Sequence, residues 1–379
     1  MGGRQVPEWT PNKRWNPFNS YKLLAHVETW RWIKRGHLLP PPILVTVDPS
    51  NACNFACGWC NAAVVRKERH RMLSRKALAN IASMLDYWGV RAVCIAGGGE
   101  PLLNPHTSEF ILALRAAKIQ VGVVTNGYLI DRHLDALAQC TWVGVSMDAG
   151  AEVSYEWTKA TPPGAWWRVR ENIARLAKRF GPRRSFGHGV TWKYLVTPGN
   201  VGEVAQAARI ARDCGCRAIH YRPVGTPWQD IGTDRAVVFS NDALLEWTRQ
   251  IADAQELDSP DFGVFGVTHK FSPQFERQQT FSACHAVFMT GVVSPPTNAG
   301  PKDGYCFGVC CDRRGDPALE LVTDCADVGK ISAMWGSAAH WAIHDAIKIG
   351  ADCPRCTYQP HNEIFEQVIQ QDAMTHVFI

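Results

Sequence analysis

The chain has 379 residues, 46% of them hydrophobic, and a formal net charge of +5 at pH 7. A chain of this length can bury a large core, so we expect one barrel-sized domain and a smaller appended domain. No apolar run is long enough to span a bilayer and the N-terminus lacks the apolar core of a signal peptide, which favours a cytoplasmic protein over a membrane or secreted one. The modest positive charge permits an anionic partner without requiring one.

The 14 cysteines are concentrated in a triplet near residue 55 and in a set after residue 283. Dense disulfides are typical of small secreted domains, so this clustering favours metal ligation in a reducing compartment. The isolated thiols of Cys94, Cys140, Cys214 and Cys216 fall in predicted strands or at helix ends, where packed thiols are expected.

Residues 1–42 form an N-terminal extension rich in Arg, Lys, Trp and Pro. Within it, residues 21–35 predict an amphipathic basic helix that ends at Gly36. Such a helix either covers one end of a barrel with a solvated basic face or offers a surface to nucleic acid or membrane. We favour the covering role.

Short β-branched runs alternate with helical patterns from residue 43 to about residue 224. This alternation is typical of parallel βαβ units, so it predicts an α/β fold. Right-handed crossovers curl about six such units into a partial (β/α)6 TIM-type barrel over residues 43–230, with chemistry at the C-terminal strand ends. The predicted strands are 43–47, 92–96, 121–125, 143–147, 190–196 and 218–222, and the predicted helices 74–88, 107–117, 132–140, 166–180 and 201–214.

Cys53, Cys57 and Cys60 follow the first predicted strand in the pattern Cys-x-x-x-Cys-x-x-Cys. Three thiolates in so short a loop converge, but a closed zinc or iron–sulfur site needs a fourth ligand and no further cysteine follows nearby. One iron of a 4Fe–4S cube would then lack a protein ligand, and an open position is where a metal site does chemistry. The alternatives are a zinc knuckle or a chance cluster of thiols.

This spacing, with Trp59 just before the last cysteine, resembles the signature of the radical S-adenosylmethionine (SAM) superfamily. The resemblance implies a 4Fe–4S cluster whose open iron binds SAM and cleaves it reductively to a 5′-deoxyadenosyl radical, which abstracts hydrogen from a substrate. After the second predicted strand, Gly98, Gly99 and Glu100 resemble the family's Gly-Gly-Glu motif, which binds the SAM amino group. A tight turn is the alternative explanation for these glycines.

The next two strand ends, at Thr125-Asn126-Gly127 and Ser146-Met147-Asp148, also recur in radical SAM barrels. The resemblance places Asn126, Ser146 and Asp148 near SAM, although strand-end capping explains Asp148 equally well. Lys193 and Arg222 on the fifth and sixth strands are candidates to hold the SAM carboxylate or a substrate anion. Salt bridges within the barrel are the alternative for both.

Residues 231–280 predict a connecting segment with one helix, 241–257, and Asn241 as its N-cap. The stretch 258–275 is expected to be irregular, either a linker or a binding loop. His269, Lys270 and Arg277 are weak candidates to meet substrate, because nothing distinguishes them from surface residues.

Residues 281–379 predict a C-terminal domain with a β-hairpin followed by a helix. Two β-rich arms around a turn bring Cys284 near Cys310 or Cys311, and Cys353-Pro-Arg-Cys356 follows later. This arrangement resembles the auxiliary-cluster extensions called Twitch and SPASM, which implies a second 4Fe–4S cluster on Cys284, Cys310, Cys353 and Cys356. The spare thiols of Cys306, Cys311 and Cys325 leave open which cysteines ligate and whether a further cluster exists, and a structural zinc is the alternative.

A small amino-acid, sugar or nucleoside metabolite is the expected substrate class, because residues 1–42 are too short to form a peptide-binding winged-helix domain. A peptide side chain and a base in nucleic acid remain alternatives, the latter because of the basic, Trp-rich N-terminus. A reducing partner such as flavodoxin or ferredoxin is implied, and no membrane partner. A zinc-stabilised binding module without enzyme activity is the alternative of another class, but it has no need of a Gly-Gly-Glu turn.

Overall fold

The computed structural model describes residues 15–63, 65, 70–181, 187–226, 230, 233–234, 236–267, 271, 280–353 and 356–370. Their strands form one sheet in the order β10-β9-β8-β1-β2-β3-β4-β5-β6-β7. Neighbours from β8 through β1 to β7 pair in parallel, whereas β9 pairs antiparallel with both β8 and β10. The strands are β1 (Leu44–Val47), β2 (Ala92–Ile95), β3 (Gln120–Thr125), β4 (Trp142–Ser146), β5 (Gly189–Val196), β6 (Ala218–Pro223), β7 (Gly263–Gly266), β8 (Thr290–Ser294), β9 (Tyr305–Gly308) and β10 (Glu320–Cys325).

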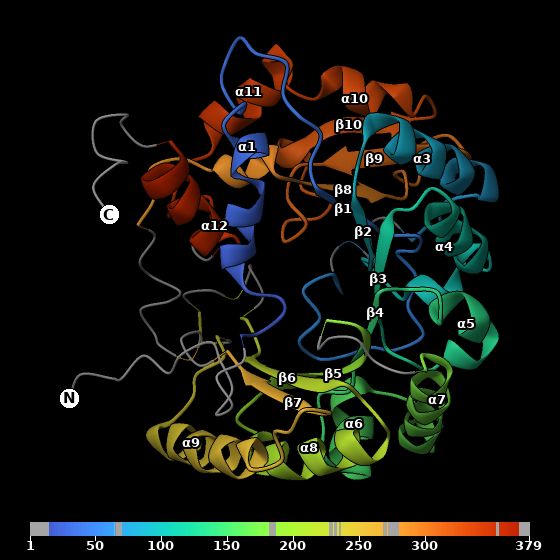
Figure 1. Ribbon diagram of the computed structural model, residues 1–379, viewed down its shortest axis with the longest axis vertical. Helices are drawn as coiled ribbons and strands as arrows, with labels where there is room; N and C mark the ends of the chain where they lie inside the picture. Colours follow the sequence, from blue (N-terminus) through green and yellow to red (C-terminus); the bar gives the residue numbers. More distant parts are fainter. Residues whose placement is uncertain are drawn as a thin grey trace.

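The sheet curves into an open arc whose convex side is covered by the helices that connect its strands (Figure 1). The partial TIM-type barrel predicted from the alternating pattern is therefore confirmed, and it is not closed. The barrel helices are α3 (Arg75–Trp88), α4 (Thr107–Ala116), α5 (Ile130–Leu137), α6 (Glu152–Lys159), α7 (Ala165–Arg179), α8 (Val204–Asp213) and α9 (Asn241–Gln255), with short 3-10 turns η2 (Pro101–Leu103) and η3 (Val201–Glu203).

Alternation along the strands separates the core from the barrel interior. Val47, Ile95 and Val145 point toward the helices and are fully buried. Successive strand side chains point to opposite faces, so residues such as Cys94 and Lys193 point to the concave side, where they keep some accessible surface. The helices thus shield one face of the sheet, and the other face is left to line a cavity.

The C-terminal part continues the barrel sheet, because β8 pairs with β1 along its whole length. Its other elements are η7 (His285–Phe288), η8 (Pro317–Leu319), α10 (Gly329–Met334), α11 (Ala338–Ala346), α12 (Gln359–Ile364) and the π-turn η9 (Phe365–Ile369). The antiparallel hairpin expected from the sequence is present as β8 and β9. Since β8 adds to β1, the hairpin lies directly beside the strand that precedes the cysteine triplet.

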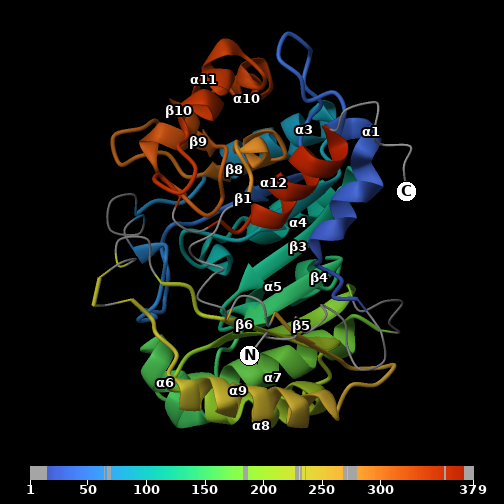
Figure 2. The same ribbon diagram turned by 90° about the vertical axis from the view of Figure 1, so that its left-hand side faces the viewer.

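The N-terminal segment consists of η1 (Ser20–His26) and α1 (Val27–Trp30), which pack beside α12 and η9 (Figures 1 and 2). The Trp30 indole donates to the Leu23 carbonyl at 2.9 Å, and Arg35 forms a 2.7 Å ion pair with Asp345. This segment therefore links the barrel to the C-terminal part, in keeping with the covering role.

Several sequence predictions were wrong in detail. The helix expected over residues 21–35 is mostly a 3-10 turn and ends at Trp30, where the indole bond to Leu23 pulls the chain tight. Ser240, not Asn241, caps α9, accepting from the Ala243 amide at 3.2 Å. Strand β7 lies inside the stretch expected to be irregular, and α6 was not predicted.

His269, Lys270 and Arg277, the candidate substrate-contacting residues of the connecting segment, lie outside the described residues. None of the helices that the structure describes is both long enough and apolar enough to cross a bilayer. The structure therefore gives no membrane-spanning helix within the described ranges.

Candidate functional site

The loop that carries Cys53, Cys57 and Cys60 leaves the C-terminal end of β1 and is fixed by the end of α6. The Ala56 amide donates to the Lys159 carbonyl at 3.1 Å, and the Gly58 amide donates to the Thr158 carbonyl at 3.4 Å. The Phe55 amide donates to the Cys53 sulfur at 3.4 Å, a contact that favours a thiolate. All three cysteines are only partly buried.

These three thiols are grouped closely enough to affect one another. Burial raises the pKa of Cys57; nearby Lys159 opposes this, while Cys60 and Cys53 add to it. Among the described residues, no group of three or more His, Cys, Asp or Glu side chains is drawn tightly enough around a point to hold a single metal ion. In a cube-shaped iron–sulfur cluster each thiolate binds a different iron, so the ligating sulfur atoms lie farther apart than those around a single ion. Three mutually interacting, partly exposed thiols on one loop fit such a cluster.

The glycine-rich turn after β2 packs directly against the cysteine loop. The Gly99 amide donates to the Ser50 carbonyl at 3.0 Å, and the Glu100 amide donates to the Ala52 carbonyl at 2.7 Å. A Cβ atom built on Gly99 would lie 2.0 Å from the Ala52 carbonyl oxygen, and one on Gly98 would lie 2.4 Å from the Asn51 Oδ1. Only glycine allows this approach of the two loops.

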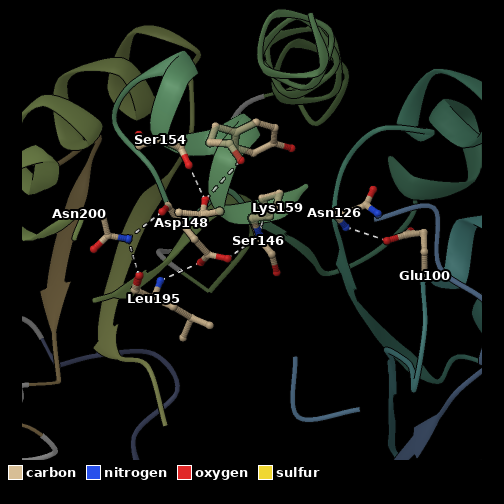
Figure 3. Close-up of polar contacts among 10 residues, drawn as sticks. Glu100, Asn126, Ser146, Asp148, Ser154, Lys159, Leu195 and Asn200 are labelled. Atoms are coloured by element: carbon tan, nitrogen blue, oxygen red, sulfur yellow. Dashed lines mark hydrogen bonds and ion pairs between the residues drawn. The ribbon is translucent and has the colours of Figure 1, made fainter. Parts of the chain in front are cut away.

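Glu100 connects the same turn to the end of β3 (Figure 3). Its buried carboxylate accepts from the Thr125 hydroxyl at 2.6 Å and from the Asn126 amide at 2.7 Å. The Asn126 side chain in turn donates to the Asn54 Oδ1 in the cysteine loop at 2.8 Å. Burial raises the pKa of Glu100 to about 6, although these hydrogen bonds favour its charged form.

Asp148 sits at the end of β4, where its main chain adopts a φ of 55°. Its carboxylate is ion-paired with the buried ammonium of Lys159 and accepts from the Leu195 amide at 2.7 Å (Figure 3). Lys159 also donates to the Ser146 carbonyl at 2.9 Å. Burial acts to lower the pKa of Lys159, but Asp148 and the thiol of Cys57 outweigh it and raise that pKa.

Lys159 was not named from the sequence, yet it joins the end of β4 to the cysteine loop. A buried carboxylate needs a cation, and Lys159 is the first Lys or Arg after Asp148 along the chain. The position of Lys159 as the first basic residue after Asp148 is the signal that sequence reasoning missed.

A cavity of about 340 Å³ occupies the concave side of the sheet. Ser146, Asp148, Lys193 and Arg222 all line it from the strand ends, so four of the sequence-predicted residues share one cavity. The N-terminal segment contributes Phe18, and the C-terminal part closes another side with Thr357, Tyr358, Pro360 and His361. Gly98, Gly99, Glu100 and Asn126 do not line this cavity and belong to the turn beside the cysteine loop.

The C-terminal cysteines form a second group, since one pocket is lined by all four predicted thiols: Cys284, Cys310, Cys353 and Cys356. Apolar side chains such as Val287 and Leu319 complete its lining. The Asn362 amide donates to the Cys356 sulfur at 3.9 Å, and Arg313 donates to the Cys353 sulfur at 3.7 Å. Four thiols around one apolar pocket, two of them receiving N–H bonds, fit a buried iron–sulfur cluster.

The three spare cysteines do not line this pocket. Cys311 contacts the Tyr358 hydroxyl at 2.8 Å, the Cys306 thiol donates to Asp324, and the Cys325 thiol donates to the Asp327 carbonyl. Cys94 was expected to be a packed thiol, but it keeps some accessible surface on the concave side of β2.

An internal ion pair links the two groups of cysteines. Arg314 donates to the Asp48 carboxylate at 2.6 Å and also to the Cys311 carbonyl. Asp48 follows β1 and is fully buried, and the Gly98 amide stabilises its charged form. The turn beside the cysteine triplet is thereby held in a fixed relation to the segment that carries Cys310.

Comparison with known proteins gives a consistent result. Residues 47–197 match the model of the radical SAM superfamily. A GTP 3′,8-cyclase of Chlorobaculum tepidum is 31% identical over 140 residues, which cover 35% of this chain and 40% of that protein. The mycofactocin maturase MftC of Mycobacterium ulcerans is 29% identical over 220 residues, 56% of each chain. The chain thus spans only about half the length of these curated relatives, or less.

Solved structures share the fold at low sequence identity. Streptococcus suis SuiB bound to S-adenosylmethionine superposes with a TM-score of 0.61 at 14% identity, covering 85% of this chain and 72% of that one. The structure of anSMEcpe with bound AdoMet and a peptide gives a TM-score of 0.59 at 14% identity, covering 85% and 88%. The radical SAM family uses a 4Fe–4S cluster and SAM, and the matched residues include the cysteine loop, the Gly-Gly-Glu turn and strands β2 to β4. Residues 47–197 are therefore a radical SAM domain.

Proposed function

We propose that this protein is a radical SAM enzyme that acts on a substrate C–H bond inside the barrel cavity. The observation that carries the proposal is the close packing of the Gly98–Glu100 turn on the cysteine loop, at the edge of the sheet where the parallel strands end. When bound, a 4Fe–4S cluster supplies the electron that cleaves SAM to methionine and a 5′-deoxyadenosyl radical, which removes a hydrogen atom from the substrate. Cys53, Cys57 and Cys60 are the proposed ligands.

The residues around the turn have positioning roles in this proposal. Gly98 and Gly99 present main-chain groups to the SAM amino group, and Glu100 holds that turn to Asn126. Ser146 and Asp148 contact SAM from the end of β4, with Lys159 fixing the Asp148 carboxylate. Arg222 offers positive charge to an acidic group in the cavity, which Lys193 also lines.

We further propose an auxiliary 4Fe–4S cluster on Cys284, Cys310, Cys353 and Cys356. Thr357 and Tyr358 line both this pocket and the barrel cavity, so the two spaces share a wall. An iron–sulfur cluster there would exchange an electron with the substrate or order the cavity. The proposed division of the chain is an N-terminal extension (1–42), a barrel (43–230), a connecting segment (231–280) and a cluster domain (281–379).

A small metabolite is the favoured substrate, because the N-terminal segment and the C-terminal part both line a cavity of about 340 Å³. A peptide is the second candidate, since SuiB was solved with its precursor peptide SuiA and MftC is named a maturase. A nucleoside-type substrate is a third candidate, because the cyclase relative is named for the nucleotide GTP. A base in nucleic acid is the least favoured candidate. A cytoplasmic location and a flavodoxin or ferredoxin as electron donor are part of the proposal.

The test is formation of 5′-deoxyadenosine from SAM by protein reconstituted without oxygen and reduced with dithionite. Wild-type protein is expected to form it and Cys57→Ala to form none. Cys214→Ala removes a buried thiol at the end of α8, away from the cysteine loop, and should retain activity. No product from wild type, with zinc found in place of iron, would leave the zinc-stabilised binding module as the explanation.

A further inference from the structure

Lys193 stands apart from the other side chains of the barrel cavity because its ammonium has aromatic neighbours and, in the part of the chain that the structure describes, no carboxylate neighbour. Its Nζ lies 4.4 Å from the centroid of the Phe18 ring and 5.6 Å from that of Trp142. The stem crosses Gly144, where a Cβ would lie 2.8 Å from the Lys193 Cε. Within the described residues, no carboxylate comes within ion-pair distance of it.

Lys159, a fully buried lysine of the same barrel, shows the contrast. Lys159 is ion-paired with Asp148 and donates to the Ser146 carbonyl, so its charge is satisfied. Lys193 has no such carboxylate partner among the described residues, yet it lines the cavity and is reachable from it. A half-buried lysine that lines a cavity, packs on aromatic rings and has no carboxylate partner in the described part of the chain is a candidate for chemistry.

The charged and titratable groups that act on Lys193 come from two other strands. Arg222 and His220 approach from β6, and Cys94 faces it from β2. Burial and then Arg222 lower the pKa of Lys193 to about 7, with Cys94 acting weakly the other way. A lysine amine desolvated by apolar surface and placed beside another cation is an activated nucleophile.

We propose that Lys193 forms a Schiff base with an aldehyde or ketone substrate, and that Arg222 binds an acidic group of the same molecule. The neutral amine adds to the carbonyl carbon, the carbonyl oxygen leaves as water, and one proton from solvent gives the iminium ion. No electrons are gained or lost in this step. The substrate class is thus a small carbonyl acid held on the aromatic floor made by Phe18 and Trp142.

This inference names a substrate class and rests on the proposed function for the use of the adduct, but its test needs no SAM cleavage. The purified full chain, kept without oxygen, is incubated at pH 7 with glyoxylate and cyanoborohydride, which reduces an iminium to a stable secondary amine. Peptide mass spectrometry then locates the adduct. At pH 7 about half of Lys193 is neutral, against less than about 0.1% of an ordinary lysine, so labelling of Lys193 should be at least about tenfold faster than that of Lys330.

Two variants and one added ligand sharpen the result. Lys193→Arg should lose the adduct, whereas Lys330→Arg, on the surface, should keep it. Arg222→Gln should slow labelling by glyoxylate about tenfold and leave labelling by acetaldehyde, which has no acid group, unchanged. The main result comes from the peptide map of the wild-type protein, so it does not depend on whether a variant folds well.

The proposal is overturned if wild-type Lys193 is labelled no faster than Lys330. It is also overturned if saturating SAM abolishes the adduct as completely as Lys193→Arg does, because Lys193 would then hold the SAM carboxylate instead. If Arg222→Gln changes the rate of Lys193 labelling by glyoxylate and by acetaldehyde equally, Arg222 does not bind the acidic group and that part of the proposal is wrong. An adduct on Lys193 in a protein that makes no 5′-deoxyadenosine would contradict the proposed function and leave this inference standing.

Discussion

A single methyl group added at Gly99 tests whether the turn and the cysteine loop must touch. In Gly99→Ala the new Cβ meets the Ala52 carbonyl oxygen at 2.0 Å and its carbon at 2.5 Å, both main-chain atoms. Ordinary contact begins at 3.4 Å, so the turn must move away by on the order of 1 Å. This movement also weakens the hydrogen bonds from Gly99 to Ser50 and from Glu100 to Ala52.

The expected loss of stability and of reaction rate in Gly99→Ala follows from this displacement of the turn. Overpacking against a rigid neighbour costs about 1–3 kcal/mol of folding free energy, and a 1 Å misplacement of a reacting group reduces rate by about 100-fold. We therefore expect Gly99→Ala to fold, to bind SAM more weakly and to form 5′-deoxyadenosine about 100-fold more slowly. The assay pairs SAM affinity by equilibrium dialysis with the rate of 5′-deoxyadenosine formation.

Gly58→Ala is the matched control, because a Cβ at Gly58 meets nothing within 4 Å. Gly58 lies between two of the triplet cysteines, so the same methyl group is added to the cysteine loop itself, away from its contact with the turn. It should keep SAM affinity and rate within about twofold of wild type. Equal values for wild type, Gly58→Ala and Gly99→Ala would refute the reasoning that the turn's contact positions SAM.

Three further predictions follow from other contacts. Lys159→Met should lower the free energy of unfolding by about 3–5 kcal/mol in denaturant titrations, because the buried Asp148 loses its ion-pair partner. Arg249→Met on the surface should cost under about 1 kcal/mol. Cys356→Ala should lose the auxiliary cluster's share of bound iron, measured colorimetrically, whereas Cys306→Ala, which lies outside that pocket, should not; equal losses would contradict the ligand assignment. Burial lowers the pKa of His340 to about 4, so the unfolded state takes up a proton first as pH falls below 6.5, and unfolding free energy should fall by about 2 kcal/mol between pH 7 and pH 5, a loss that His340→Gln should reduce.

The sequence predicted the barrel strands well because most of them are short runs rich in β-branched residues, with one face buried against helices. It missed β7, since Gly263-Val-Phe-Gly266 has only two apolar residues and is flanked by glycine, a turn signal. Docking of β8 on β1 also escaped it, because pairing between residues 44 and 290 leaves no local pattern. Local periodicity therefore reveals elements but not long-range partners.

The candidate site shows the same division. The cysteine triplet was found from local spacing, and the glycine turn from its resemblance to a family motif. Hairpin topology left Cys310 and Cys311 as alternatives, and the resemblance to auxiliary-cluster extensions selected the four C-terminal thiols that line one pocket. Lys159 and Arg314 were not found, since each is one basic residue among 40 and gains its role only from a buried carboxylate brought near by folding. The aromatic floor under Lys193 likewise joins Phe18 and Trp142 from distant segments.

The most direct test of the central claim is the electron paramagnetic resonance spectrum of the reduced protein before and after SAM is added. If the cluster on Cys53, Cys57 and Cys60 has an open iron beside the Gly98–Glu100 turn, SAM should shift its signal in wild type and in Cys356→Ala, which retains that cluster alone. Cys57→Ala should show no SAM-dependent change. A spectrum that SAM leaves unaltered in wild type, or a shift that persists in Cys57→Ala, would contradict the assignment of SAM to this loop.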